Sequence, residues 1–218
     1  MGTHSDRARE ALLDAAEELF ARDGIGAVSN RRIVEHAGAA NHSAIAYHFG
    51  GREGLLRALV MRHQDEISRR RDELISQLSD APSIHELITC RLRPLVELLD
   101  GLPRPSWRAQ FISQVSAVPS AVGVVKDVIG GSDVPEDLRF INGAVEGIPE
   151  GVLRGRAYLL GSMVVRVCAD QEARMNEDAN KGSWEQVGRF LIDAAAGMLA
   201  APVTDPDGAV RYPNVPLL

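Results

Sequence analysis

Residues 29–56 read SNRRIVEHAGAANHSAIAYHFGGREGLL, and this stretch decides the fold of the amino-terminal part of the chain. Ser29 is a typical helix N-cap, and Gly38 ends a short helix that contains Ile33. A second short helix is expected over about residues 41–49. Two short helices joined by a tight turn with glycine and small residues predict a helix-turn-helix.

A helix-turn-helix of this size cannot bury its apolar side chains alone, so the flanking segments must support it. Apolar residues recur at helical spacing over residues 5–23, with charged residues on the opposite side. Gly50 and Gly51 then break the chain, and apolar spacing predicts a long helix from Arg52 to about Ser79. These two helices are expected to cover the inner face of the helix-turn-helix.

The rest of the chain is also helical in pattern, with no convincing strand alternation and no internal repeat. The fold class is therefore all-α. Residues 5–51 are expected to form the helix-turn-helix domain, residues 52–201 a second helical domain, and residues 202–218 an extended or disordered tail. Further helices are expected over residues 83–102, 106–118, 149–174 and 183–201, with one more helix and a loop between residues 119 and 148.

Charge is divided unevenly along the chain. The net charge is −6, but residues 1–71 hold 11 arginines against 10 acidic residues, so the acidity belongs to the remainder. Because solvent screens charges over about 10 Å at moderate salt, an acidic body does not prevent one end from binding DNA. No run of about 18 apolar residues predicts a membrane span, and the amino end lacks the apolar region of a secretory signal. The cytoplasm is the expected location, with Cys90 and Cys168 as buried free thiols.

The polar side of the short-helix pair fits a nucleic-acid surface. Asparagine, histidine, serine and tyrosine can exchange hydrogen bonds with base edges or phosphates, while arginine suits the phosphate backbone. The candidates for hydrogen bonding are Asn41, His42, Ser43 and Tyr47. The candidates for backbone contact are Arg31, Arg32 and Arg52. Each has a structural alternative: Asn41 is equally well placed to cap the second short helix.

Residues from Arg7 to about Val60 resemble the amino-terminal domain of the TetR (tetracycline repressor-like) family of bacterial transcriptional regulators. The resemblance lies in SNRRIVEHAG at residues 29–38 and in YHFGGREGLL at residues 47–56. It implies that Ser29 caps its helix and also touches phosphate, that residues 41–47 form the recognition helix, and that Tyr47 and His48 lie near phosphate. Arg52 matches a basic residue that binds phosphate. The segment from Gly38 to Phe49 is one residue longer than the commonest family pattern and is similar to a variant that reads Asn-x-Ser-Ala before Tyr-His-Phe.

The last two helices carry apolar stripes that favour a four-helix interface between two copies of the chain. The resemblance implies the same homodimer. The expected interface residues are Leu159, Met163, Val167, Phe190, Leu191, Ala194 and Met198. Residues 83–148 are expected to enclose a mostly apolar cavity for an unknown small apolar or amphipathic ligand. Its aromatic candidates are Trp107, Phe111 and Tyr158.

These features predict a ligand-responsive repressor that binds double-stranded DNA at a near-palindromic operator and is released by its effector. No phosphate loop, nucleophile elbow or metal-binding helix motif is present, so no enzyme activity, metal or cofactor is expected. Two alternatives stay open at this stage. An architectural or partner-binding helical protein would have a solid core in place of the cavity, and a cofactor-free helical enzyme would have a polar cluster inside it.

Overall fold

The computed structural model describes residues 2–39, 41, 43–117, 147–178 and 180–205, and every regular element in these ranges is an α-helix. The predicted all-α fold class is therefore confirmed. The helices are α1 (Gly2–Asp23), α2 (Asn30–His36), α3 (Ala44–Phe49), α4 (Arg52–Met61), α5 (Gln64–Ile75), α6 (Ile84–Gly101), α7 (Arg108–Ala117), α10 (Glu150–Glu177) and α11 (Trp184–Ala200).

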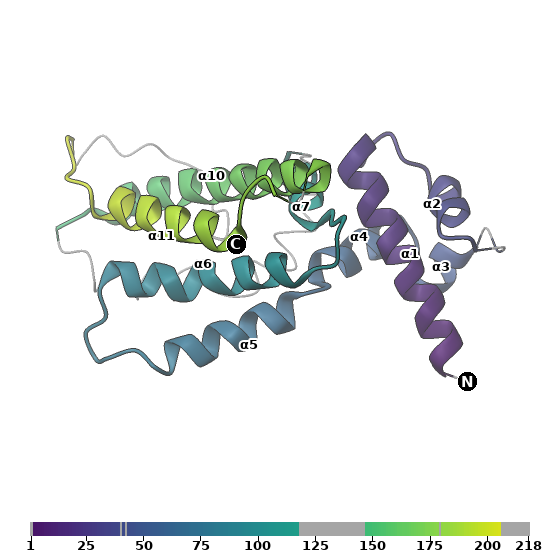
Figure 1. Cartoon of the computed structure of the whole chain (residues 1–218), viewed down its shortest axis with the longest axis horizontal. Coiled ribbons are helices and arrows are strands. Elements are labelled where there is room, and N and C mark those ends of the chain that lie inside the picture. Colours follow the sequence, from purple (N-terminus) through teal and green to yellow (C-terminus); the bar gives the residue numbers. More distant parts are fainter. Residues whose placement is uncertain (1, 40, 42, 118–146, 179, 206–218) are drawn as a thin grey trace.

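The helices form two groups along the long axis of the molecule (Figure 1). The first three helices lie at one end, with α2 and α3 on the outer side of α1 (Figure 1). Helices α5, α6, α10 and α11 run along the other end as a bundle (Figure 1). Helix α7 packs against both α1 and α10, and α4 leads from the first group to α5. We call the first group, α1 to α3 with the start of α4, the head and the bundle the body.

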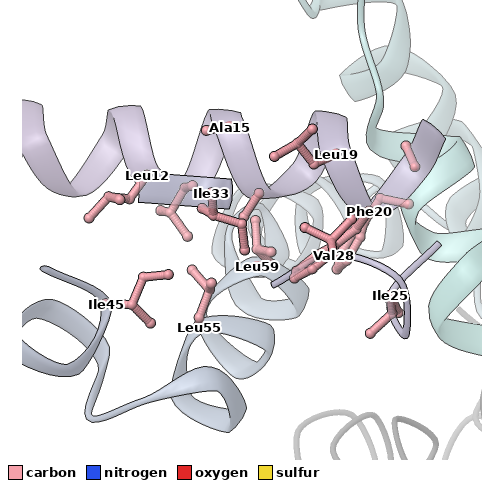
Figure 2. Close-up of a cluster of buried hydrophobic side chains, with 14 of the residues drawn as sticks. Leu12, Ala15, Leu19, Phe20, Ile25, Val28, Ile33, Ile45, Leu55 and Leu59 are labelled. Atoms are coloured by element: carbon pink, nitrogen blue, oxygen red, sulfur yellow. The ribbon is translucent and has the colours of Figure 1, made fainter. Parts of the chain in front are cut away.

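One apolar core holds the head together (Figure 2). The inner face of α1 supplies Leu12, Leu19 and Phe20, and these side chains are at most 2% exposed. Ile33 from α2 and Leu55 from α4 close the same core from the other side. Burial of each such side chain contributes about 1.5 to 3 kcal/mol, which explains why the two short helices are stable only on this support.

Glycine is required where α3 meets α4. A Cβ atom on Gly54 would lie 1.8 Å from the carbonyl oxygen of Phe49, so no other residue fits this close approach. Gly50, at the end of α3, has a φ of 71°, a left-handed conformation that costs glycine little. The sharp turn holds α3 at a fixed angle to α4.

The body has a second, separate apolar core between α6, α10 and α11. Its most buried members are Leu153, Leu160, Leu191 and Leu199. Helix α6 begins with a capping box in which Ser83 and Glu86 satisfy each other's backbone amides. The start of the helix expected over residues 83–102 is therefore confirmed.

The single long helix predicted from Arg52 to about Ser79 is wrong, because the chain breaks at residues 62–63. The amide of Arg62 donates to the carbonyl of Leu59, which ends α4 in a tighter turn. In a continuous helix the carbonyls of Leu59 and Val60 would accept from the amides of His63 and Gln64. Here both carbonyls accept from the guanidinium of Arg108 on α7, at 2.6 Å and 3.0 Å. A side chain from a distant part of the sequence thus takes the acceptors that the helix would use.

None of the described helices is both long and apolar enough to cross a membrane. The helix and loop expected between residues 119 and 148 lie outside the described residues, apart from the last two positions. Of the expected tail, the structure describes residues 202–205, which contain no helix.

Candidate nucleic-acid interface

Tyr47 is the most exposed large apolar side chain of the described head. Helix α3 buries Ala44 and Ile45 against the core, which leaves Tyr47 on the opposite side with 78% of its surface exposed. Its ring meets the ring of His48 edge-on, with 4.9 Å between the centroids. His48 is half-buried and lies beside Phe49. The tyrosine hydroxyl consequently lies outside the core and is available to an external acceptor or donor.

The turn before α3 is fixed by Asn41. Its side-chain oxygen accepts hydrogen bonds from the amide of Ser43 at 2.9 Å and from the Ser43 hydroxyl at 2.8 Å. The N-cap of α3 is Ser43, so Asn41 does not cap this helix; its side chain instead forms a turn that shapes the entry to α3. Both residues are exposed. His42, between them, lies outside the described residues.

The start of α2 presents one capped helix end and two arginines. The hydroxyl of Ser29 accepts from the amide of Arg32 at 3.2 Å, as predicted for an N-cap. Arg32 forms an ion pair with Asp23 at 2.6 Å, which ties α2 to the end of α1. Arg31 is 77% exposed and pairs within its own helix, with Glu35 at 2.7 Å. Its hydrogen bond to Glu35 raises the pKa of Arg31, so the guanidinium stays charged.

Arg52 begins α4, as expected, and its side chain turns toward the α1–α2 loop. Its guanidinium donates to the side-chain oxygen of Asn30 at 3.2 Å and to the carbonyl of Ile25. It also stacks over the ring of Phe20, 5.0 Å from the centroid. Burial lowers the pKa of Arg52, as expected for a guanidinium drawn toward the core. Arg52 thus ties α4 to the α1–α2 loop, and its contact with phosphate stays a prediction.

The body contains a cavity that the three expected aromatic residues do not line. The cavity has a volume of about 70 Å³ and lies between α4, α5, α6, α7 and α10. Its described lining includes Val60, Ile67, Leu99, Ala109, Ile112 and Val165. Trp107 and Phe111 pack against the core of the head, and Phe111 stacks with Phe20 at 6.2 Å. Tyr158 is half-buried on α10.

The expected interface residues on α10 and α11 differ in exposure. Phe190 is 62% exposed and Leu159 is 48% exposed, both unusually high for large apolar side chains. Four others are half-buried: Met163, Val167, Ala194 and Met198. Leu191 is fully buried within the single chain and has no surface to offer a partner. Each exposed side chain therefore stays a candidate for an interface.

A buried polar cluster joins head and body, and sequence reasoning missed it. Arg108, 3% exposed at the start of α7, donates to Glu17 on α1 at 3.1 Å as well as to the α4 carbonyls. Arg62 donates to the second oxygen of Glu17, also at 3.1 Å. Glu172 on α10 is 1% exposed and accepts from the amides of Ala109 and Gln110, at 3.1 Å and 2.9 Å. No pattern in the sequence marks these residues, because their partners lie 45 to 91 positions away.

His63 lies at the break between α4 and α5, beside this cluster. Its side chain is 17% exposed and Nδ1 lies 3.9 Å from a carboxylate oxygen of Glu66. Burial, followed by the positive charges of Arg108 and Arg62, lowers the pKa of His63 to about 4. The ring is therefore neutral at pH 7.

Acidification is expected to destabilise the protein through His63. Its ordinary pKa of 6.5 applies in the unfolded chain, which therefore binds a proton more readily than the folded chain. The stabilising contribution is complete above pH 6.5 and is lost as the pH falls toward 4. Between about pH 7 and 5, the wild-type protein should lose about 2 kcal/mol more free energy of unfolding than His63→Gln. Urea unfolding at both pH values measures this, and equal losses in the two proteins would contradict it.

Comparisons with known proteins agree with the arrangement of the head. Residues 12–59 match the family model described as bacterial regulatory proteins, tetR family. A TetR-family transcription regulator from Marinobacter aquaeolei VT8 superposes with a TM-score of 0.57 at 16% identity, covering 91% of this chain and 98% of its own. A protein from Shewanella sp. PV-4, provisionally assigned to the same family, gives 0.56 at 17% identity, covering 86% and 97%. At these identities the superpositions show a shared fold. No curated protein matches the sequence.

Proposed function

We propose that this chain is a repressor whose binding to a near-palindromic operator is relieved by a small ligand. The match of residues 12–59 to the tetR-family model and the all-helical fold shared with a TetR-family regulator support this proposal. The observation that carries the proposal is that α2 and α3 each have one buried apolar face and one exposed polar face. Their inner residues are buried in the head core, while Tyr47 and Arg31 stand out on the surface. Such a unit uses its apolar face for support and presents its polar face to a partner.

Two copies of the chain would provide two such heads. Phe190 on α11 and Leu159 on α10 are exposed large apolar side chains, which a second copy would bury about a two-fold axis. A dimer places its recognition helices in successive major grooves about one helical turn apart, and the operator then reads as a palindrome. Neither head alone would bind tightly at physiological salt, since each contacts only a few phosphates.

The cavity of the body is the candidate effector site. Its lining is mostly apolar, with Gln64, Arg71, Arg108 and Ser116 as its polar members, which suits a small apolar or amphipathic molecule. Burial, together with the charge of Glu172, raises the pKa of Cys168 to about 12. The thiol is therefore uncharged at neutral pH and adds to the apolar lining of the cavity. A ligand relieves repression only if it binds the DNA-released conformation more tightly than the bound one.

Selection of bound fragments from genomic DNA tests the proposal. Enrichment of one palindromic sequence is the expected result, and enrichment of none, with equal binding to unrelated fragments, would favour an architectural protein.

Tyr47→Ala should weaken binding to the selected operator about 10- to 30-fold, because a dimer loses two hydrogen bonds of about 1 kcal/mol each.

Tyr47→Phe separates the hydroxyl from the ring in the same assay, since it removes only the group that hydrogen-bonds. Thermal melting should be unchanged in both variants, because the side chain is 78% exposed. Unaltered operator affinity in Tyr47→Ala would remove this contact from the proposed interface.

A further inference from the structure

The first turn of α7 touches the cavity, the head and the break between α4 and α5 at once. Ala109 and Arg108 both line the cavity, as does Val60 at the end of α4. Arg108 also donates to the carbonyls of Leu59 and Val60 and to the carboxylate of Glu17 on α1. The Arg108 side chain therefore contacts the cavity, α1 and the end of α4, and α1 and α4 would both move if the head turned relative to the body.

The backbone of this turn is itself anchored to α10. Glu172 accepts from the amides of Ala109 and Gln110 and, at 2.7 Å, from the hydroxyl of Ser106. Asn176, one turn further along α10, donates to the carbonyl of Ser106 at 2.7 Å. These buried and partly buried bonds hold the start of α7 in place, so a molecule that enlarges the cavity would displace the Arg108 side chain more readily than the turn that carries it.

Withdrawal of Arg108 would change the structure of α4 and α5 in a defined way. The buried carbonyl of Val60 would lose the Arg108 donor and that of Leu59 would keep only the amide of Arg62, which costs free energy. The nearest replacements are the amides of His63 and Gln64, the donors that a continuous helix uses. Helices α4 and α5 would then join into one helix, and the head, which is built on α4, would change its direction. The segment thus has two discrete arrangements, broken and continuous.

We infer that Arg108 is the switch residue between the cavity and the head: it keeps the α4–α5 break open when the cavity is small, and its displacement by an occupant closes the break and reorients the head. This inference rests on the proposed function for its consequence on DNA. The structural change itself, from a broken to a continuous helix, does not depend on DNA binding.

Neutral replacement of the buried pair tests the switch in the full-length protein. Glu17→Gln with Arg108→Met removes the guanidinium together with the carboxylate that it pairs with, and the introduced amide oxygen can still accept from Arg62. The amides of His63 and Gln64 should then exchange hydrogen about tenfold more slowly than in the wild type, because they gain helical acceptors. The matched control is Arg70→Met with Glu97→Gln, an ion pair of 2.8 Å between α5 and α6 that faces solvent. It should leave these amides unchanged.

Val165→Phe provides a second route that keeps Arg108 and fills the cavity from the opposite wall, on α10. It should slow exchange at the same two amides in the wild-type background and have no further effect in the neutral-pair variant. If the neutral-pair variant does not fold, the exchange rates measured in Val165→Phe alone test the inference. Faster or unchanged exchange at His63 and Gln64 in the folded variants would overturn the inference.

Operator binding separates this inference from the proposed function. Both the neutral pair and Val165→Phe should weaken binding to the selected operator about 5- to 150-fold, the usual range of coupling between two sites. A wild-type protein that selects no operator would refute the proposed function. The hydrogen exchange of His63 and Gln64 would still show whether displacement of Arg108 closes the break between α4 and α5. If exchange slows but operator affinity is undiminished, the inference that closing the break reorients the head is wrong.

Discussion

Arg108→Met is expected to lower the free energy of unfolding by about 3 to 5 kcal/mol, the usual cost of removing one partner from a buried ion pair. The guanidinium is 3% exposed, and it satisfies the carbonyls of Leu59 and Val60 as well as the carboxylate of Glu17. Methionine fills a similar volume but donates nothing. Two buried carbonyls and one largely buried carboxylate would therefore lose a donor together.

Urea unfolding at one fixed protein concentration measures this loss, since association would otherwise alter the apparent stability. Arg70→Met is the comparison, because Arg70 pairs with Glu73 and Glu97 in contact with solvent and should cost less than about 1 kcal/mol. Adding Glu17→Gln to Arg108→Met should recover part of the stability by removing a largely buried carboxylate that keeps only Arg62 as its partner. Equal losses in the two single variants would mean that the buried cluster contributes little.

The architecture of the head could be predicted from the sequence because its determinants are local. Leu12, Leu19 and Phe20 recur at helical spacing, and each lies on the buried face of α1. Ser29 caps α2 through its own side chain, within three residues. Helix α3 begins at Ala44, three residues after its expected start, because the side chain of Asn41 bonds to Ser43 and forms a turn in place of a helical first turn.

The features that the sequence could not predict depend on distant partners. The break at residues 62–63 exists because Arg108 takes the carbonyls of α4, and nothing in the apolar spacing around Arg62 indicates it. Arg52 turns toward Ile25 and Asn30 for the same kind of reason. Periodicity shows which side of a helix is apolar but not which neighbour it meets. Trp107 and Phe111 consequently pack on the head, although their pattern equally suited a cavity in the body.

Operator affinity is expected to fall about 10³- to 10⁵-fold between about 50 and 200 mM salt, as it does for proteins with six to ten phosphate contacts. This effect follows from the release of counterions from DNA, and two heads with several arginines each would supply such a number. The measurement is the dissociation constant of the selected operator over a series of potassium chloride concentrations. A flat dependence would argue against DNA as the partner.

Arg31 gives this prediction a residue-level test. Arg31→Gln should reduce the slope of log affinity against log salt by about 1.8 per dimer, because each phosphate that is no longer neutralised lowers it by about 0.9. Arg93→Gln is the matched control, because Arg93 on α6 pairs with Glu97 over the same i,i+4 spacing and the same 2.7 Å as Arg31 with Glu35. Both variants change the net charge equally. A phosphate contact by Arg31 requires the slope to change in the first variant alone, whereas a general effect of protein charge would shift both slopes alike.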